Sequence, residues 1–230
     1  MYPQTVEEFG GYRIRTRHVD VAGERFLVVG PDQYESLLDD PRVAARFARD
    51  EYMPYWAEFW PAALLLAEAV AAWGPPADPA APARVLEVGC GLGLVSLVAL
   101  RLGYAVVASD YDQDALAFVA ENARRNGLPQ PLTRYVDWRE TYVDLRCDRI
   151  VAAEVLYEDR NLRPVAEFVR NHLVENGFAL ICDRNRSTAD AFPEVAGACG
   201  LKVEITLARL PGPAGEPDIA GRIFRLSRVL

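Results

Sequence analysis

The chain of 230 residues is predicted to adopt an α/β fold: a seven-stranded, mostly parallel sheet with helices on both faces and an antiparallel C-terminal hairpin. Three observations support this prediction. Short apolar segments alternate with helical patterns between residues 84 and 198, and short connections of this kind imply right-handed crossovers between parallel strands. A glycine-rich turn separates the first of these strands from its helix. The last two strand patterns are joined by a Pro/Gly-rich loop without a helix, so they should pair antiparallel.

An N-terminal extension over residues 1–52 is expected to precede the sheet domain of residues 53–230. Residues Tyr12 to Val29 alternate apolar and polar side chains around Ala22-Gly23-Glu24, which predicts a β-hairpin. Two short helical patterns follow. A further helix should begin at Pro61, because proline suits the first helical position and an apolar face follows it. A linker rich in proline and alanine, residues 74–82, then leads to the sheet.

The elements of the sheet domain follow from the alternation. Parallel strands are predicted at Arg84–Val88, Ala105–Ser109, Leu132–Tyr135, Arg149–Ala153 and Phe178–Cys182. Helices are predicted at Leu94–Arg101, Gln113–Asn126, Leu162–Val174 and Thr188–Ala198. The terminal hairpin should consist of Lys202–Leu207 and Arg222–Arg228.

Composition narrows the class of protein. The net charge is −8, which argues against nucleic acid as the main partner because a phosphate backbone requires a basic surface. All but one of the 25 basic residues are arginine, a bias typical of a GC-rich bacterial genome. The acidic N-terminus without an apolar run predicts no signal peptide, and no apolar segment is long enough to span a bilayer. No residues have metal-ligand spacing, and the four cysteines lie far apart. We therefore expect a cytoplasmic, metal-free protein that does not contact membranes, and a monomer.

The segment from Glu87 to Gly93 is the most informative motif. Glycines at alternate positions allow close approach of the backbone to a ligand, and Asp110 at the end of the second strand can accept hydrogen bonds from two ribose hydroxyls. A dinucleotide fingerprint requires Gly-x-Gly-x-x-Gly, but here the third glycine comes one residue early and Leu94 takes its place. The motif therefore indicates a nucleoside ligand other than a dinucleotide.

The other strand ends supply further candidates, because ligands of open parallel sheets bind beyond the carboxyl ends of the strands. Asp137 and Trp138 follow the third strand, and together they offer an adenine ring an aromatic wall and a carboxylate for its amino group. Glu154 and Tyr157 follow the fourth strand. A capping or salt-bridging acid is the alternative interpretation of Glu154.

These motifs resemble the S-adenosylmethionine site of the seven-β-strand (class I) methyltransferases, whose sheet is Rossmann-like. Trp60-Pro61, Asp137-Trp138 and Glu154-x-x-Tyr157 further resemble the protein-lysine methyltransferase branch, relatives of the enzymes that modify chaperones, elongation factors and the electron-transfer flavoprotein. The resemblance covers roughly residues 52–183 and implies S-adenosylmethionine as cofactor. It also implies that Glu154 and Tyr157 face the methyl-accepting amine.

Combining residues and resemblance, we expect Glu154 and Tyr157 to be catalytic. We expect the cofactor to be bound by Trp60, Glu87, Gly89, Cys90, Gly91, Asp110, Tyr111, Asp137, Trp138 and Ala153. The acid is glutamate where aspartate is commoner in the family. Neither the N-terminal hairpin nor the loop Asp183-Arg184-Asn185-Arg186 matches anything in it, so substrate recognition by these segments is open. The hypothesis is an S-adenosylmethionine-dependent protein-lysine N-methyltransferase. A small-molecule amine N-methyltransferase and a non-catalytic cofactor-binding scaffold are the alternatives, and a hairpin that sealed the acceptor opening would favour the small amine.

Overall fold

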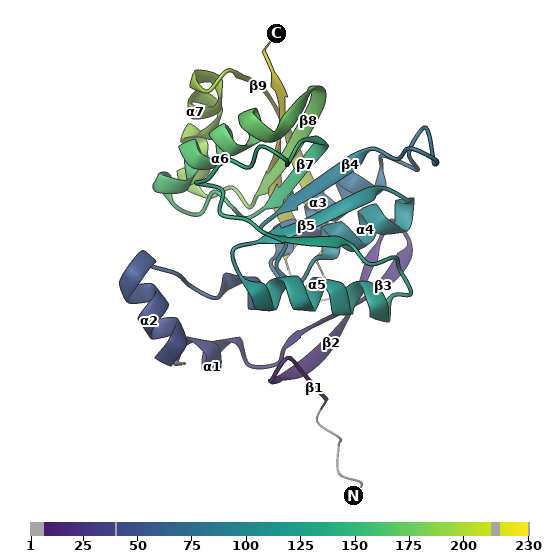
Figure 1. The fold of residues 1–230 in the computed structure, drawn as a ribbon, viewed down its shortest axis with the longest axis vertical. Coiled ribbons are helices and arrows are strands. Elements are labelled where there is room, and N and C mark those ends of the chain that lie inside the picture. Colours follow the sequence, from purple (N-terminus) through teal and green to yellow (C-terminus); the bar gives the residue numbers. More distant parts are fainter. Residues whose placement is uncertain (1–6, 40, 213–216, 230) are drawn as a thin grey trace, which may run out of the picture.

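The computed structural model describes residues 7–39, 41–212 and 217–229 and arranges them around a seven-stranded sheet (Figure 1). The strand order is β6-β5-β4-β7-β8-β10-β9. Its members are β4 (Arg84–Val88), β5 (Ala105–Asp110), β6 (Leu132–Tyr135), β7 (Cys147–Ala153), β8 (Leu173–Asp183), β9 (Leu201–Leu210) and β10 (Ile219–Arg228). Strands β4 to β8 pair in parallel, and β10 is antiparallel to both β8 and β9. The predicted fold class is confirmed.

Helices cover both faces of the sheet because residues on its strands alternate between two apolar clusters. Helices α3 (Pro61–Ala71), α4 (Leu94–Leu102) and α5 (Gln113–Arg125) lie on one face, and α6 (Asp159–His172) and α7 (Phe192–Ala198) on the other. Strand residues packed toward α3 and α4 include Val85, Val106, Val151 and Leu180. Those packed toward α6 and α7 include Leu86, Val107, Ile150 and Ile181. Burial on both faces explains why these strands are almost continuously apolar in sequence.

Two predicted helices differ from the observed ones. The helix predicted over Leu162–Val174 begins three residues earlier, at Asp159, and ends at His172. It ends there because Leu173 is extended and already pairs with Cys147 as the first residue of β8. The helix predicted over residues 188–198 is divided into a 3-10 turn, η2 (Ser187–Ala191), and α7. Pro193 lies in the first turn of α7. Its missing N–H and fixed φ favour a helix start there over a continuous helix.

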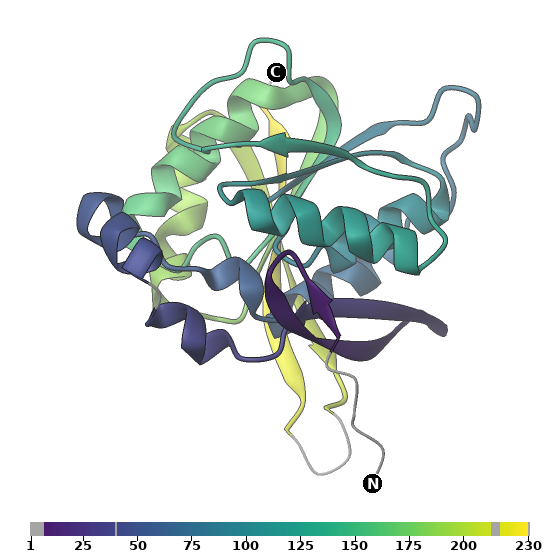
Figure 2. The same cartoon turned by 60° about the horizontal axis from the view of Figure 1, so that its bottom comes forward.

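The N-terminal residues form a small sheet with a helical pair beside it. Strands β1 (Glu8–Phe9), β2 (Tyr12–Val21) and β3 (Glu24–Pro31) pair antiparallel, so the predicted hairpin is present and carries one additional short strand. Helices α1 (Tyr34–Leu38) and α2 (Pro41–Asp50) follow and stand away from the central sheet in both views (Figure 2). Side chains of β2 and β3 belong to the same apolar cluster as α3 and α4. The division of the chain at residue 52 stays a prediction.

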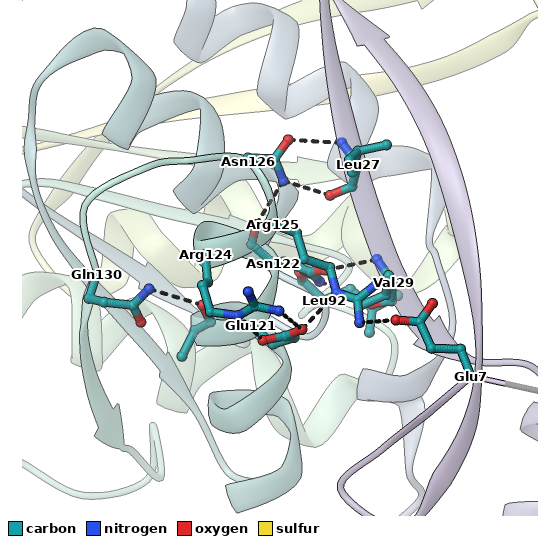
Figure 3. A network of polar contacts seen from close by, with 11 residues as sticks. Glu7, Leu27, Val29, Leu92, Glu121, Asn122, Arg124, Arg125, Asn126 and Gln130 are labelled. Carbon is teal, nitrogen blue, oxygen red and sulfur yellow. Dashed lines mark hydrogen bonds and ion pairs between the residues drawn. The ribbon is translucent and has the colours of Figure 1, made fainter.

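Asn122 of α5 and Asn126, the C-cap residue of the same helix, bind the backbone of β3 (Figure 3). The Asn126 amide accepts from Leu27 N (2.9 Å) and donates to Leu27 O (2.7 Å). One helical turn earlier, the Asn122 amide accepts from Val29 N (2.8 Å) and donates to Val29 O (3.0 Å). Asn122 also donates to Leu92 O (2.9 Å), so a single side chain joins the N-terminal sheet to the glycine-rich loop.

Candidate functional site

A cavity of about 650 Å³ lies at the carboxyl ends of β4, β5 and β7, where the strand order reverses. This is the edge at which open parallel sheets bind ligands. Its lining includes every residue that the sequence predicted for the site: Trp60, Glu87, Gly89, Cys90, Gly91, Asp110, Tyr111, Asp137, Trp138, Ala153, Glu154 and Tyr157. Their common location is a fact of the structure, whereas their individual roles stay predictions.

Two glycines of the loop between β4 and α4 lie where an added side chain would meet a neighbouring residue. A Cβ at Gly91 would lie 3.2 Å from the carbonyl oxygen of Trp56, and one at Gly93 only 2.2 Å from a methyl group of Val119. Both glycines have positive φ angles, +50° and +82°, which other residues rarely adopt. Gly91 therefore allows the loop to lie close to the backbone of Trp56, while Gly93 allows α4 to pack closely on α5.

Glu87 connects β4 to the start of α4. Its carboxylate accepts from the Ser96 backbone N–H (2.8 Å) and from the Ser96 hydroxyl (2.5 Å). Ser96 is the third residue of α4, so Glu87 satisfies one of the N–H groups that a helix start leaves unpaired. Burial raises the pKa of Glu87 to about 8, although the bonds from Ser96 oppose that shift. At least one of its oxygens therefore has a structural role.

Asp110 lies at the end of β5 with both carboxylate oxygens in use but not saturated. Oδ2 accepts from Gly91 N (2.9 Å) and Oδ1 accepts from Asp112 N (3.0 Å). The backbone N–H of Tyr111 is a further donor to this carboxylate, which has four acceptor sites in all and so keeps capacity for a ligand. Burial raises the pKa of Asp110 to about 7, and the N–H of Gly91 opposes this shift.

The wall after β6 contains an arginine that the sequence analysis missed. Arg139 pairs with Asp137 (2.6 Å between Nη2 and Oδ2), and its guanidinium lies 5.3 Å from the centre of the Tyr111 ring. The carboxylate predicted to meet an adenine amino group therefore already has a cationic partner. Trp138 lies beside Gly89, with its ring 3.7 Å from the position that a Cβ there would take.

Three aromatic side chains form the opposite part of the cavity. The rings of Tyr55 and Tyr157 are 5.3 Å apart, and those of Tyr55 and Trp60 are 5.9 Å apart, both edge to face. Trp60 donates its indole N–H to the carbonyl oxygen of Tyr55 (2.8 Å). Burial raises the pKa of Tyr157 to about 12, so its phenol stays neutral at physiological pH.

Glu154 follows β7 in a left-handed backbone conformation, with φ +59°, which is uncommon for a residue other than glycine. The residue is 7% exposed. Its Oε2 pairs with the guanidinium of Arg186, whereas its Oε1 is buried and has no hydrogen-bond partner in the described part of the chain. The salt bridge that was the alternative interpretation of Glu154 is thus present in the structure, together with one oxygen that no protein group uses.

Arg186 comes from the loop after β8, the segment Asp183-Arg184-Asn185-Arg186, to which the sequence alone assigned no role. Its backbone N–H donates to Oδ1 of the fully buried Asp183 (2.7 Å), and its guanidinium lies 6.0 Å from the centre of the Trp60 ring. An arginine three residues after the last parallel strand was the available signal.

The N-terminal hairpin does not border the cavity, since none of residues 7–29 is in its lining. The side of the opening next to α2 is formed by Glu51, Tyr52 and Met53. Glu51 and Glu158 both pair with Arg160 at this rim. Within residues 7–39, 41–212 and 217–229, no group of three or more histidine, cysteine or acidic side chains could hold a metal ion. No helix in those ranges is long and apolar enough to cross a membrane.

Comparison with known proteins places this geometry in a family. Residues 75–202 match the family model described as tellurite resistance protein TehB. A ribosomal protein L11 methyltransferase from Agathobacter rectalis is 31% identical over 127 residues, which cover 52% of this chain and 39% of that protein. The chain thus spans less than half the length of the curated relatives it matches.

Solved structures share the fold. A TehB-like S-adenosylmethionine-dependent methyltransferase from Corynebacterium glutamicum aligns with a TM-score of 0.55 at 17% identity, covering 85% of this chain and 98% of that one. A ribosomal protein L11 methylase from Lactobacillus delbrueckii aligns with a TM-score of 0.54 at 20% identity, over 71% and 76% of the two chains.

Proposed function

This chain belongs to the TehB family of class I S-adenosylmethionine-dependent methyltransferases, and we propose from this premise that it methylates the side-chain amine of a lysine in a protein. One observation carries the proposal. Glu154 lines an open, predominantly acidic cavity beside three aromatic rings and keeps one carboxylate oxygen without a protein partner. A hydrogen-bond acceptor next to aromatic faces suits an amine.

The cavity fits S-adenosylmethionine as the cofactor of the family. Its volume is in the range of small-molecule sites, and the glycine-rich loop from Gly89 to Gly93 lines it. We infer that Asp110 would hold the ribose hydroxyls and that Trp138 would lie against the adenine. When bound, the cofactor supplies an electrophilic methyl group on a positively charged sulfur, which keeps the electrons of the broken bond as it leaves.

The charge of the cavity supports a cationic or neutral nitrogen over an oxyanion as the acceptor. Seven of its lining residues are acidic and three are arginines, and although burial raises the pKa of Glu87 and Asp110, the other five acids still outnumber the arginines. An oxyanion such as tellurite, which appears in the name of the family, would be repelled by this excess of negative charge. A basic protein surface would instead be attracted to it, chiefly through a faster encounter.

A protein acceptor is also supported by the shape of the opening and by the relatives. Residues 7–29 pack against α5 and do not line the cavity, so the described part of the hairpin does not seal it against a long side chain. The curated relatives are named ribosomal protein L11 methyltransferase. A small amine would usually need a lid that closes over it.

The test is transfer of a tritiated methyl group from S-adenosylmethionine to a bacterial lysate. We expect label in protein, recovered as methyl-lysine after acid hydrolysis, and a loss of about tenfold or more with the Glu154→Gln variant. Label confined to small molecules would replace the lysine acceptor by a small amine. Cofactor binding without any transfer would favour the scaffold.

A further inference from the structure

The two oxygens of Glu154 have different surroundings. Oε2 is paired with the guanidinium of Arg186, whereas Oε1 is buried without a hydrogen-bond partner among the described residues. A buried carboxylate oxygen without a partner costs free energy, so a structure that retains one usually supplies the partner from a ligand or water. The left-handed φ of Glu154 is a second local cost at the same residue.

Arg186 is fixed from several sides. Its N–H donates to Asp183, and Asp183 Oδ2 also lies 3.5 Å from its guanidinium. The backbone oxygen of Arg186 accepts from Arg222 (3.0 Å), which in turn pairs with Asp190 (2.6 Å). The charged and titratable groups around the Glu154–Arg186 pair are therefore Asp183, Asp190, Arg222, Tyr55, Tyr157 and, at the rim, Glu158 with Arg160.

This arrangement resolves a conflict in amine methylation. The acceptor nitrogen must give up a proton before its lone pair can attack, and desolvation by the aromatic walls favours the neutral amine. An isolated carboxylate beside it would favour the ammonium instead. A guanidinium already paired with that carboxylate cancels most of its charge while leaving one oxygen as an acceptor.

We propose that Arg186 is a positioning residue for the methyl acceptor: it neutralises Glu154, so that Glu154 orients the amine by a hydrogen bond without holding it as a cation. This inference rests on the proposed amine acceptor. Without Arg186, the uncompensated Glu154 would bind the ammonium form and keep its lone pair protonated. Arg186 thereby selects the charge state of the acceptor.

The test compares two amines of similar size near neutral pH. Ethylamine is protonated there, whereas the fluorines of 2,2,2-trifluoroethylamine keep it neutral. Binding of each to the protein saturated with S-adenosylhomocysteine is measured by NMR titration for the wild type, Arg186→Met and Arg186→Lys. The control is Arg184→Met, which removes the same charge from an exposed position of the same loop.

We expect the wild type to prefer the neutral amine, and Arg186→Met to shift the preference toward ethylamine by about tenfold or more. Arg186→Lys and Arg184→Met should keep the wild-type preference. Unchanged S-adenosylhomocysteine affinity and thermal unfolding in Arg186→Met would exclude a merely structural effect. If Arg186→Met fails either control, Arg186→Lys decides. A preserved preference for the neutral amine in Arg186→Lys supports a role for the positive charge, and a lost preference contradicts the inference.

Two negative outcomes have different meanings. If both amines bind and Arg186→Met leaves their ratio unchanged, the role of Arg186 is wrong while the amine acceptor stands. If neither amine binds to the wild type while S-adenosylhomocysteine does, the proposed amine acceptor is wrong and this inference is wrong with it.

Discussion

Replacement of Asp110 by alanine should weaken S-adenosylmethionine binding in a pH-dependent manner. Both oxygens of Asp110 accept a backbone N–H, from Gly91 at 2.9 Å and Asp112 at 3.0 Å, and the carboxylate lines the cavity, where we infer that it holds the ribose hydroxyls. Loss of two hydrogen bonds to a charged acceptor, partly offset by water, should cost about 2–4 kcal/mol of binding free energy. That corresponds to a dissociation constant raised roughly 30- to 1,000-fold.

The pH dependence follows from the raised pKa of Asp110, about 7 in the cofactor-free protein. Hydroxyl donors favour the carboxylate, so binding must release a proton wherever Asp110 is protonated. Wild-type affinity should therefore fall below about pH 7, by up to about tenfold per pH unit. Asp110→Ala should lose that part of the slope, whereas the titration of Glu87 is common to both proteins.

Isothermal titration calorimetry between about pH 6 and pH 8 measures both effects. Asp144→Ala is the control, because it removes an exposed carboxylate that pairs only with Arg134 in the described contacts. Equal affinities of wild type and Asp110→Ala at about pH 8 would remove Asp110 from the cofactor site. A wild-type affinity that did not change with pH would contradict the hydrogen bonding inferred for its carboxylate.

Three further predictions concern the glycine-rich loop, the acceptor and helix α4. Gly93→Ala should lower the free energy of unfolding by about 2–5 kcal/mol in urea titrations, because the new Cβ would lie 2.2 Å from Val119. Gly23→Ala is the control: Gly23 has the same φ of +82° but no neighbour within 4 Å, so its replacement should cost only about 1–2 kcal/mol. Glu154→Gln should reduce single-turnover methyl transfer about tenfold or more while calorimetry finds the cofactor affinity unchanged; a loss of folding instead would assign Glu154 to the salt bridge alone. The raised pKa of Glu87 means that the folded, cofactor-free protein binds this proton more tightly than the unfolded chain does, so the contribution of Glu87 to stability is full below its ordinary pKa and is lost as the pH rises to about 8. Glu87→Gln should therefore flatten the pH dependence of the free energy of unfolding in urea over this range. An unchanged slope would contradict the assignment.

The sheet was predictable because its signals are local. Each buried strand is a short apolar run, and the turn at Gly89 to Gly93 needs glycines for reasons that act within a few residues. The boundary at Leu173 was missed because its strand character comes from pairing with Cys147, a contact between segments far apart in sequence. Helical periodicity alone extends through Leu173 and carries no information about that partner.

The membership of the site was predictable for a related reason. Residues directly after parallel strands converge on one edge of the sheet whatever their side chains are, so Asp110, Trp138 and Glu154 could be grouped from the sequence. Their partners could not be predicted in the same way. Arg186 meets Glu154 across 32 positions of sequence, and Arg139 pairs with Asp137 only because the local chain turns back. Long side chains in loops lack a periodic signal.

Asn122 and Asn126, at the C-terminal end of α5, also determine where the N-terminal hairpin can dock. Leu27 and Val29 are two residues apart on β3, a spacing of about 6–7 Å. Asn122 and Asn126 are about one helical turn apart, a spacing of about 5–6 Å, so the two amides match the two strand residues. A slip by one residue would turn the apolar face of β3 outward, and a slip by two would leave one amide without its strand partner. The same two amides occupy backbone groups that a neighbouring strand would otherwise use, so this stretch of β3 is closed to strand addition and to edge-to-edge aggregation.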